Sequence, residues 1–118
     1  MGTGQRRRHQ RFPVEWKASI TSMTLGDKQP AEVTEISRSG LTVSCSAMMD
    51  AGEPCSIFVD VQDGRTVAGM YVDGVVINCA SKDGTFRYGV LIVGADGYGA
   101  KLYERVVTLR EEADEANG

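Results

Sequence analysis

The sequence predicts an all-β domain, an antiparallel sandwich or small barrel of six strands, followed by one C-terminal α-helix. Three observations lead to this class. Apolar and polar residues alternate with a period of two in several segments. Short turns containing Gly and Asp separate these segments at spacings of roughly ten residues. Only the last apolar segment changes to the spacing of an amphipathic helix.

The six predicted strands are short segments rich in β-branched and aromatic residues. In the first, residues 14–21, apolar side chains occupy alternate positions, so one face is expected to be buried. The others cover residues 31–36, 41–45, 55–61, 66–80 and 86–93. Because residues 66–80 are too long for one flat strand and contain Gly69 and Gly74, we expect a bulge or bend at a glycine.

Turns and loops are predicted by polar residues and glycines between the strands. Gly26-Asp27-Lys28 separates the first two strands, and residues 38–40 and 50–54 interrupt the chain after the second and third. Asp63-Gly64 and Asp83-Gly84 are hairpin signals, because Asp-Gly fits the two-residue turns that join antiparallel strands.

The C-terminal helix is predicted from about Ala100 for about three turns. Leu102, Val106 and Leu109 are spaced i, i+4, i+7 and form an apolar stripe. We expect this stripe to pack against the sheet or to cap an open end of the barrel. The acidic residues after Arg110 lack apolar partners and are expected to fray into solvent.

The chain has 118 residues, which allows one domain, and its charge is unevenly distributed. Four arginines and no acids within residues 1–11 carry +4, so the rest must carry −7 to give the total of −3. We therefore divide the chain into a basic arm (1–13), a β-barrel with its helix (14–110) and an acidic flexible tail (111–118). The acidic body disfavours a general nucleic-acid binder, whose positive charge covers a whole face.

Several other classes of site and location are disfavoured. The three cysteines match neither a metal-binding CxxC spacing nor a paired disulfide framework, and Cys55 and Cys79 are expected to be small buried hydrophobes. His9, the one histidine, lies among the arginines, so neither a zinc site nor a catalytic pair is indicated. We expect no enzyme activity and no cofactor. The sequence has no apolar run that could span a membrane and no secretory signal, so we expect a cytoplasmic protein.

Two polar segments carry residues suited to ligand binding. The arginines of the arm can form bidentate hydrogen bonds with the O6 and N7 atoms of guanine, or with phosphate. The second segment, residues 35–41, offers the carboxylate of Glu35, the hydroxyl of Ser37 and close backbone approach at Gly40. A carboxylate can accept from the N1–H and N2–H groups of guanine. Taken alone, this second segment also fits a hairpin turn with polar residues.

The order of the two segments resembles the PilZ family. Arg7-x-x-x-Arg11 is followed, within a six-stranded β domain, by Glu35-x-Ser37-x-x-Gly40. The resemblance extends over roughly residues 5–110 and includes Phe12-Pro13-Val14, Tyr88-Gly89-Val90 and the C-terminal helix. It implies a six-stranded antiparallel PilZ-like β-barrel that binds the bacterial second messenger cyclic di-GMP.

The resemblance also implies roles for individual residues. Arg7 and Arg11 would hold guanine edges and phosphates, and Ser37 and Gly40 match the second motif. Glu35 departs from the family pattern, which has Asp or Asn there, and its extra methylene moves the carboxylate. A misplaced buried carboxylate costs on the order of 1–3 kcal/mol. The predicted ligand-binding residues are Arg6, Arg7, Arg8, Arg11, Glu35, Ser37, Arg38 and Gly40.

Three hypotheses about function follow. The leading one is a cyclic di-GMP receptor whose arm folds over the ligand and creates a surface for an effector protein. The second is a degenerate PilZ-like adaptor that binds no nucleotide and acts by protein contact, which Glu35 favours. The third, an RNA or DNA binder, is disfavoured by the acidic body and by the few aromatic residues available for base stacking.

Overall fold

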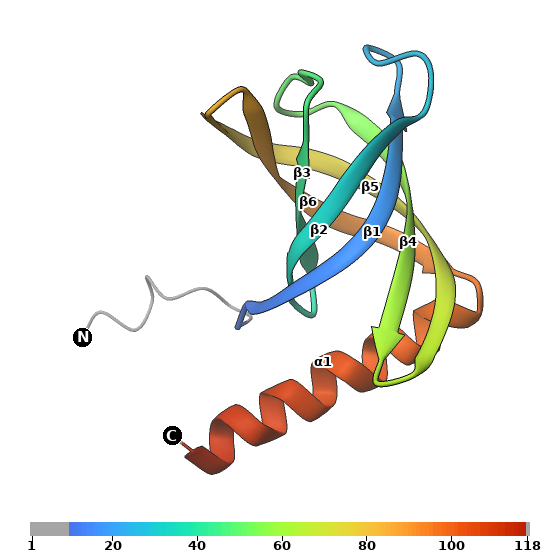
Figure 1. Ribbon diagram of the computed structural model, residues 1–118, viewed down its shortest axis with the longest axis vertical. Helices are drawn as coiled ribbons and strands as arrows, with labels where there is room; N and C mark the ends of the chain where they lie inside the picture. Colours follow the sequence, from blue (N-terminus) through green and yellow to red (C-terminus); the bar gives the residue numbers. More distant parts are fainter. Residues whose placement is uncertain (1–9, 118) are drawn as a thin grey trace.

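Six antiparallel strands form a closed barrel with one helix beneath it (Figure 1). The computed structural model describes residues 10–117. Its elements are β1 (Phe12–Ser22), β2 (Gln29–Ile36), β3 (Gly40–Cys45), β4 (Pro54–Asp63), β5 (Thr66–Lys82), β6 (Thr85–Asp96) and α1 (Tyr98–Asn117). Around the barrel the order is β1-β2-β3-β6-β5-β4, and β4 pairs back with β1. The predicted six-stranded antiparallel barrel with a C-terminal helix is confirmed.

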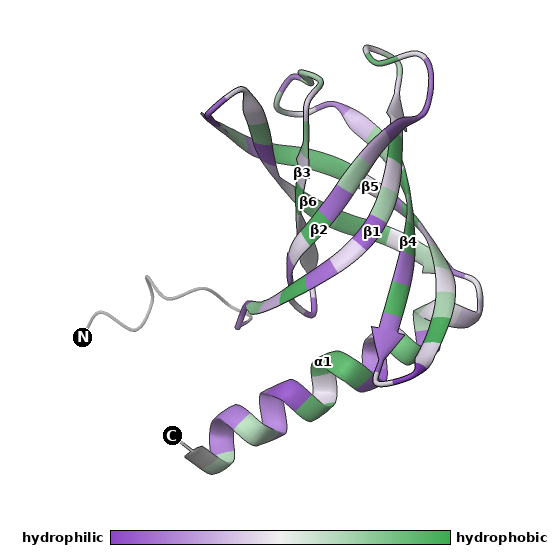
Figure 2. Ribbon diagram, in the orientation of Figure 1, coloured by the Kyte–Doolittle hydropathy of each residue, from purple (hydrophilic) through white to green (hydrophobic). Residues whose placement is uncertain are grey.

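The core fills the barrel and continues into the contact with α1. Alternate residues of the strands point inward, so side chains such as Ile20, Val59 and Met70 are fully buried. Tyr103, Val106 and Val107 of α1 are also buried and close the lower end of the barrel. Figure 2 shows that the part of α1 under the barrel carries both apolar and polar residues, and that the helix is mostly polar toward its C-terminal end. The helix therefore caps the barrel, as predicted, although Leu109 of the predicted stripe is 47% exposed.

The predicted turns and the predicted bulge are confirmed. The β5–β6 hairpin turns at Asp83-Gly84, where both residues have positive φ (53° and 78°), as a type I′ turn requires. The β5–β6 register shifts at Gly74, where an added Cβ would lie 2.5 Å from a methyl group of Val90. Glycine at this position lets the two strands approach closely. A second shift lies between Val76 and Asn78.

Helix α1 is longer than predicted. The predicted end near Arg110 is wrong, because the helix continues through the acidic residues to Asn117. The first of these acids, Glu111, forms an ion pair with Arg38 of the β2–β3 connection, 73 residues away. Helical periodicity in the C-terminal sequence could not show this cation, because it comes from a different part of the chain.

The expectation that Cys79 is buried is wrong. Cys45 and Cys55 are buried, whereas Cys79 is exposed. The pairing of β5 with β4 ends at Val75, and the last six residues of β5 are all exposed. This part of the β5–β6 hairpin projects at the upper left of Figure 1, so its alternating residues have no second layer to pack against.

The upper end of the barrel is held by polar groups that bond to one another. The Tyr88 hydroxyl donates to the carbonyl of Ala47 (2.7 Å) and accepts from the amide of Met49 (2.8 Å). The Glu53 carboxylate accepts from the amides of Thr24 (3.1 Å) and Asp50 (3.0 Å). These contacts connect the β1–β2 and β3–β4 loops to the barrel.

Candidate ligand-binding cleft

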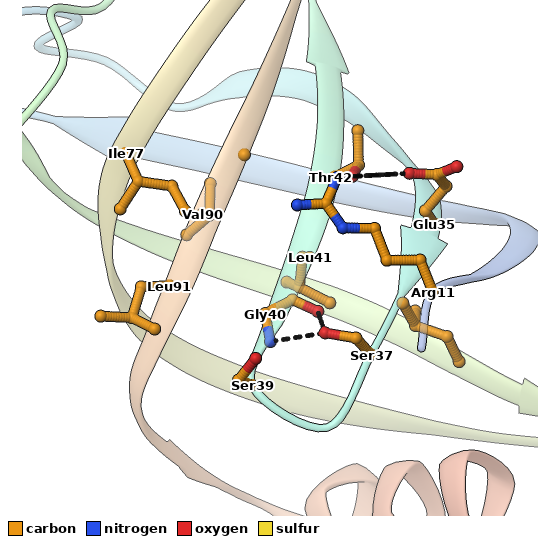
Figure 3. Close-up of a pocket in the computed structure, with 12 residues that line it drawn as sticks. Arg11, Glu35, Ser37, Ser39, Gly40, Leu41, Thr42, Ile77, Val90 and Leu91 are labelled. Carbon is orange, nitrogen blue, oxygen red and sulfur yellow. Dashed lines mark hydrogen bonds and ion pairs between the residues drawn. The ribbon is translucent and has the colours of Figure 1, made fainter. Parts of the chain in front are cut away.

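A cleft of about 230 Å³ opens beside the β2–β3 turn, between the start of β1 and strands β5 and β6 (Figure 3). It is lined by residues from four strands, from the β2–β3 turn and from the position just before β1. They are Arg11, Glu35, Ile36, Ser37, Ser39, Gly40, Leu41, Thr42, Ile77, Gly89, Val90 and Leu91. The cleft thus contains Arg11, Glu35, Ser37 and Gly40, which come from the two segments singled out in the sequence.

Ser37 shapes the β2–β3 turn through its backbone and its side chain. Its amide donates to the carbonyl of Gly40 (3.0 Å), and its hydroxyl accepts from the amide of Gly40 (3.1 Å) and donates to the same carbonyl (3.3 Å). The proton of the hydroxyl is therefore used within the turn. In this conformation Ser37 organises the cleft edge and offers a ligand only the remaining acceptor capacity of its oxygen.

Gly40 stands where β3 passes close to the backbone of β6. A Cβ at this position would lie 2.5 Å from the carbonyl oxygen of Val90. Any larger residue would push the two strands apart, because backbone cannot move aside as a flexible side chain can. The glycine of the second motif is thus required by the barrel itself, in addition to any role in ligand approach.

Glu35 and Arg11 meet on the outer surface of the barrel. Glu35 Oε1 accepts from the hydroxyl of Thr42 (3.1 Å) and lies 3.8 Å from Arg11 Nη1. The register explains this arrangement, because Glu35 of β2 is paired with Pro13 of β1 and with Thr42 of β3. Both side chains remain partly exposed, at 33% for Arg11 and 42% for Glu35. A donor fork and an acceptor therefore stand side by side and face solvent.

The opposite side of the cleft is apolar. Ile77 of β5 and Leu91 of β6 line it while remaining 50% and 43% exposed. Neither these two residues nor Thr42 was predicted from the sequence. Thr42 could have been found, since it lies two positions after Gly40 on the same face of a strand. Ile77 and Leu91 could not, because a register shift next to Ile77 decides which way this part of β5 faces.

Arg38 lies away from the cleft, although it belongs to the same turn. Its Nη2 is 2.6 Å from Glu111 Oε1 and donates to the hydroxyl of Thr108 (2.8 Å), so the side chain is directed toward α1. The hydrogen bond with Glu111 raises the pKa of the Arg38 guanidinium. The structure therefore does not bring Arg38 to the other predicted ligand-binding residues. Arg6, Arg7 and Arg8 lie outside the described residues.

The described part of the chain offers little for other types of site. Residues 10–117 contain no group of three or more His, Cys, Asp or Glu side chains placed to hold a metal ion. Burial raises the pKa of the Cys55 thiol to about 11, so this sulfur is poorly suited to act as a nucleophile or metal ligand. Across the same residues, no helix combines the length and apolar character needed to cross a membrane.

Comparison with known protein families identifies the fold. The model of the PilZ domain matches residues 5–108. The chain belongs to the PilZ family. Arg11 and the segment from Glu35 to Gly40 both lie within the matched PilZ region. No curated protein matches the sequence.

Solved structures share this PilZ fold at low sequence identity. The Bacillus subtilis inhibitor of motility MotI/DgrA has a TM-score of 0.75 at 12% identity, over 92% of this chain and 53% of that one. Escherichia coli YcgR in complex with c-di-GMP has a TM-score of 0.68 at 18% identity, over 95% of this chain and 49% of that one. The PilZ domain of Escherichia coli YcgR with c-di-GMP has a TM-score of 0.67 at 16% identity, over 96% of this chain and 98% of that one. The chain thus spans about half of the first two proteins and nearly all of the third.

Proposed function

We propose that this PilZ domain is a cyclic di-GMP receptor. The observation that carries the proposal is the meeting of Arg11 and Glu35 at the cleft beside the Ser37–Gly40 turn. Two segments that are separate in the sequence there form one surface with a cationic fork, a carboxylate and an apolar wall. Two structural neighbours of this chain, both of YcgR, are complexes with c-di-GMP.

The chemistry of the cleft suits a guanine nucleotide. The Arg11 guanidinium can donate two hydrogen bonds to O6 and N7 of a guanine, or grip a phosphate. The Glu35 carboxylate can accept from N1–H and N2–H at the other edge of the base. Ile77 and Leu91 offer apolar contact to the face of the ring. The cleft therefore offers a single guanine base a hydrogen-bond donor, an acceptor and an apolar wall.

The size of the cleft indicates how much of the ligand it holds. Its volume of about 230 Å³ is below the roughly 300–1,000 Å³ of sites that enclose a drug-sized ligand. We propose that it takes one guanine, and that Arg6, Arg7 and Arg8 contact the rest of the ligand. Ordering of the arm over the ligand would change the exposed surface, which an effector protein would recognise.

The proposed role is binding and not catalysis, and the proposed location is the cytoplasm. The charge distribution fits this role, because a basic arm on an acidic body suits a small dianion better than a long nucleic acid. The ligand would act as a signal that alters a protein contact, and the chain would require no cofactor.

Isothermal titration calorimetry with cyclic di-GMP tests the proposal. We expect wild type to bind at tens of micromolar protein or below, and Arg11→Ala to bind at least tenfold more weakly, since charge-assisted hydrogen bonds contribute about 1.5–3 kcal/mol. Arg65→Ala is the matched control, because Arg65 is an exposed arginine at the tip of the β4–β5 hairpin. No heat of binding with the wild type, or equal affinities of wild type and Arg11→Ala, would overturn the proposal.

One observation favours the adaptor as a second candidate function. Glu35, where the family has Asp or Asn, already contacts Thr42 and Arg11, so a guanine would have to displace these contacts. A chain that had lost nucleotide binding could retain such a contact and act by protein association alone. No heat with cyclic di-GMP for either wild type or Glu35→Asp would support this candidate.

A further inference from the structure

The Ser37–Gly40 turn has a second face, opposite the cleft, that rests on α1. The Tyr103 hydroxyl lies 2.6 Å from the carbonyl oxygen of Ser37 and 3.1 Å from that of Gly40. One phenolic group thus spans both ends of the turn. The same two residues form the cleft edge, so the position of that edge depends on where α1 places Tyr103.

Tyr103 is held firmly enough to act as a fixed point. Its side chain is only 6% exposed, and its ring packs edge-on against Trp16 with centroids 6.1 Å apart. Burial raises the pKa of Tyr103 well above its ordinary value, so the hydroxyl keeps its proton for donation. A buried carbonyl without this donor would lose its hydrogen bond and have no access to water.

Arg38 forms the second connection between the turn and α1. Its guanidinium reaches Thr108 and Glu111, two half-buried residues that are three positions apart on one helix face. The helix end beyond Arg110 is acidic and has no basic residue in its last turn, although carboxylates near a C-terminus are unfavourable for a helix. Arg38 supplies a cation to Glu111, the first of these acids, from outside the helix.

We propose that Arg38 and Tyr103 are positioning residues that couple the ligand cleft to α1. The proposal rests on the proposed function, and it assigns Arg38 a role different from ligand contact. A ligand that fixes the cleft face of the turn also fixes the Ser37 and Gly40 carbonyls and the backbone of Arg38. By thermodynamic linkage, ligand binding then strengthens the attachment of α1, and detachment of α1 lowers ligand affinity by the same factor.

A charge-swap experiment tests the coupling through Arg38. Cyclic di-GMP affinity is measured by calorimetry for wild type, Arg38→Glu, Glu111→Arg and the double variant Arg38→Glu/Glu111→Arg. We expect each single variant to bind about five-fold more weakly, the effect of losing a well-formed exposed ion pair. The double variant is expected to return to within about two-fold of wild type, because the pair is restored with opposite polarity.

The control separates this contact from the general charge of the helix. Glu112→Arg makes the same change one position further on, at an exposed residue that takes part in no hydrogen bond or ion pair between described residues. It should bind like wild type. If Arg38 touched the ligand, Arg38→Glu would remain weak in the double variant and Glu111→Arg would bind normally, and either result overturns the coupling. A wild type that does not bind overturns the proposed function instead.

Hydrogen exchange tests the coupling through Tyr103. In wild type, saturating cyclic di-GMP should slow amide exchange in residues 103–112 of α1, which lie outside the cleft. Tyr103→Phe keeps the ring that packs on Trp16 and removes only the hydroxyl, so the fold should persist. In this variant the ligand-dependent slowing in α1 should fall by at least half while the slowing in β3 remains. Equal slowing in wild type and Tyr103→Phe, or no slowing in α1 of wild type, would overturn the inference.

Discussion

The two ends of the barrel use a glutamate in opposite ways. At the upper end, Glu53 accepts hydrogen bonds from the Ser22 hydroxyl and from the amides of Asp50 and Thr24, which together lower its pKa to about 2. At the lower end, the described contacts of Glu35 are one hydroxyl at 3.1 Å and one guanidinium at 3.8 Å. The lower carboxylate lies in a cleft, whereas the upper one joins loops.

This difference in hydrogen bonding distinguishes a binding site from a structural joint on one small barrel. A structural joint uses its hydrogen-bonding capacity within the protein, since each satisfied group stabilises the folded chain. A binding site leaves donors and acceptors loosely engaged, because a ligand must replace those contacts at little cost. The following variants test this distinction, beginning with the largest expected effect.

Gly40→Ala should disrupt the cleft end most strongly. The new Cβ would stand 2.5 Å from the Val90 carbonyl oxygen, so β3 and β6 must separate. We expect the free energy of unfolding in urea to fall by about 2–3 kcal/mol, as for other overpacked sites, and cyclic di-GMP binding to be lost.

Gly94→Ala is the matched control for this variant. Gly94 also lies in β6, but a Cβ there meets nothing within 4 Å. Its unfolding free energy should stay within about 0.5 kcal/mol of wild type. Similar losses in the two variants would mean that the close approach at Gly40 is not the cause.

Tyr88→Phe should weaken the upper end and leave the cleft intact. The variant removes the hydroxyl that joins Ala47 to Met49, and leaves a buried amide and a carbonyl without their partner. We expect a loss of about 1–2 kcal/mol in unfolding free energy. Calorimetry should then give an unchanged affinity for cyclic di-GMP, and a weaker affinity would contradict the separation of the two ends.

Glu35→Asp sharpens the description of the lower end. Asp is a residue that the family has at this position, and its shorter side chain would withdraw from Thr42 and release Arg11. We expect cyclic di-GMP to bind about five-fold more tightly, which corresponds to about 1 kcal/mol. Weaker binding by calorimetry would show that the longer carboxylate of Glu35 is itself the better ligand contact.

The contribution of Glu53 to the pH dependence of the unfolding free energy should be the smallest of these effects. Its pKa is about 2 in the folded protein and near the ordinary value of 4.5 in the unfolded chain. The stabilisation from the ionised carboxylate is therefore full above pH 4.5 and is lost as the pH falls toward 2. In urea titrations between pH 6 and pH 2, wild type should be more stable than Glu53→Gln at pH 6, and the two should converge at pH 2. A constant difference over this range would contradict the assignment.

The sequence predicted most of the fold because its strands and turns are encoded locally. Alternation in residues 14–21 marked the inner face of β1, and Asp83-Gly84 marked a turn that needs two positive φ angles. The helix boundary and the exposure of Cys79 were predicted wrongly. The exposure of Cys79 depends on a distant segment, because the pairing of β5 with β4 ends at Val75. The contact of Glu111 with Arg38 also comes from a distant segment, but it does not account for the helix beyond Glu111.

The site was predicted less completely than the fold. Arg11, Glu35, Ser37 and Gly40 could be named from their motifs, and the structure brings them together. The apolar wall of Ile77 and Leu91 could not be named, because a register shift in β5 sets its position. The motif also gave no indication that the Ser37 hydroxyl is bound within the turn, or that Arg38 is directed toward the helix.

The projecting β5–β6 hairpin has a practical consequence. Of the three thiols, Cys45 and Cys55 are buried, and burial raises the pKa of both, while Cys79 stands in the exposed part of β5. A maleimide dye should therefore attach to the native chain at a single position, two residues from the cleft residue Ile77. The chain thus carries its own attachment point for a fluorescent reporter of nucleotide arrival, with no engineered cysteine.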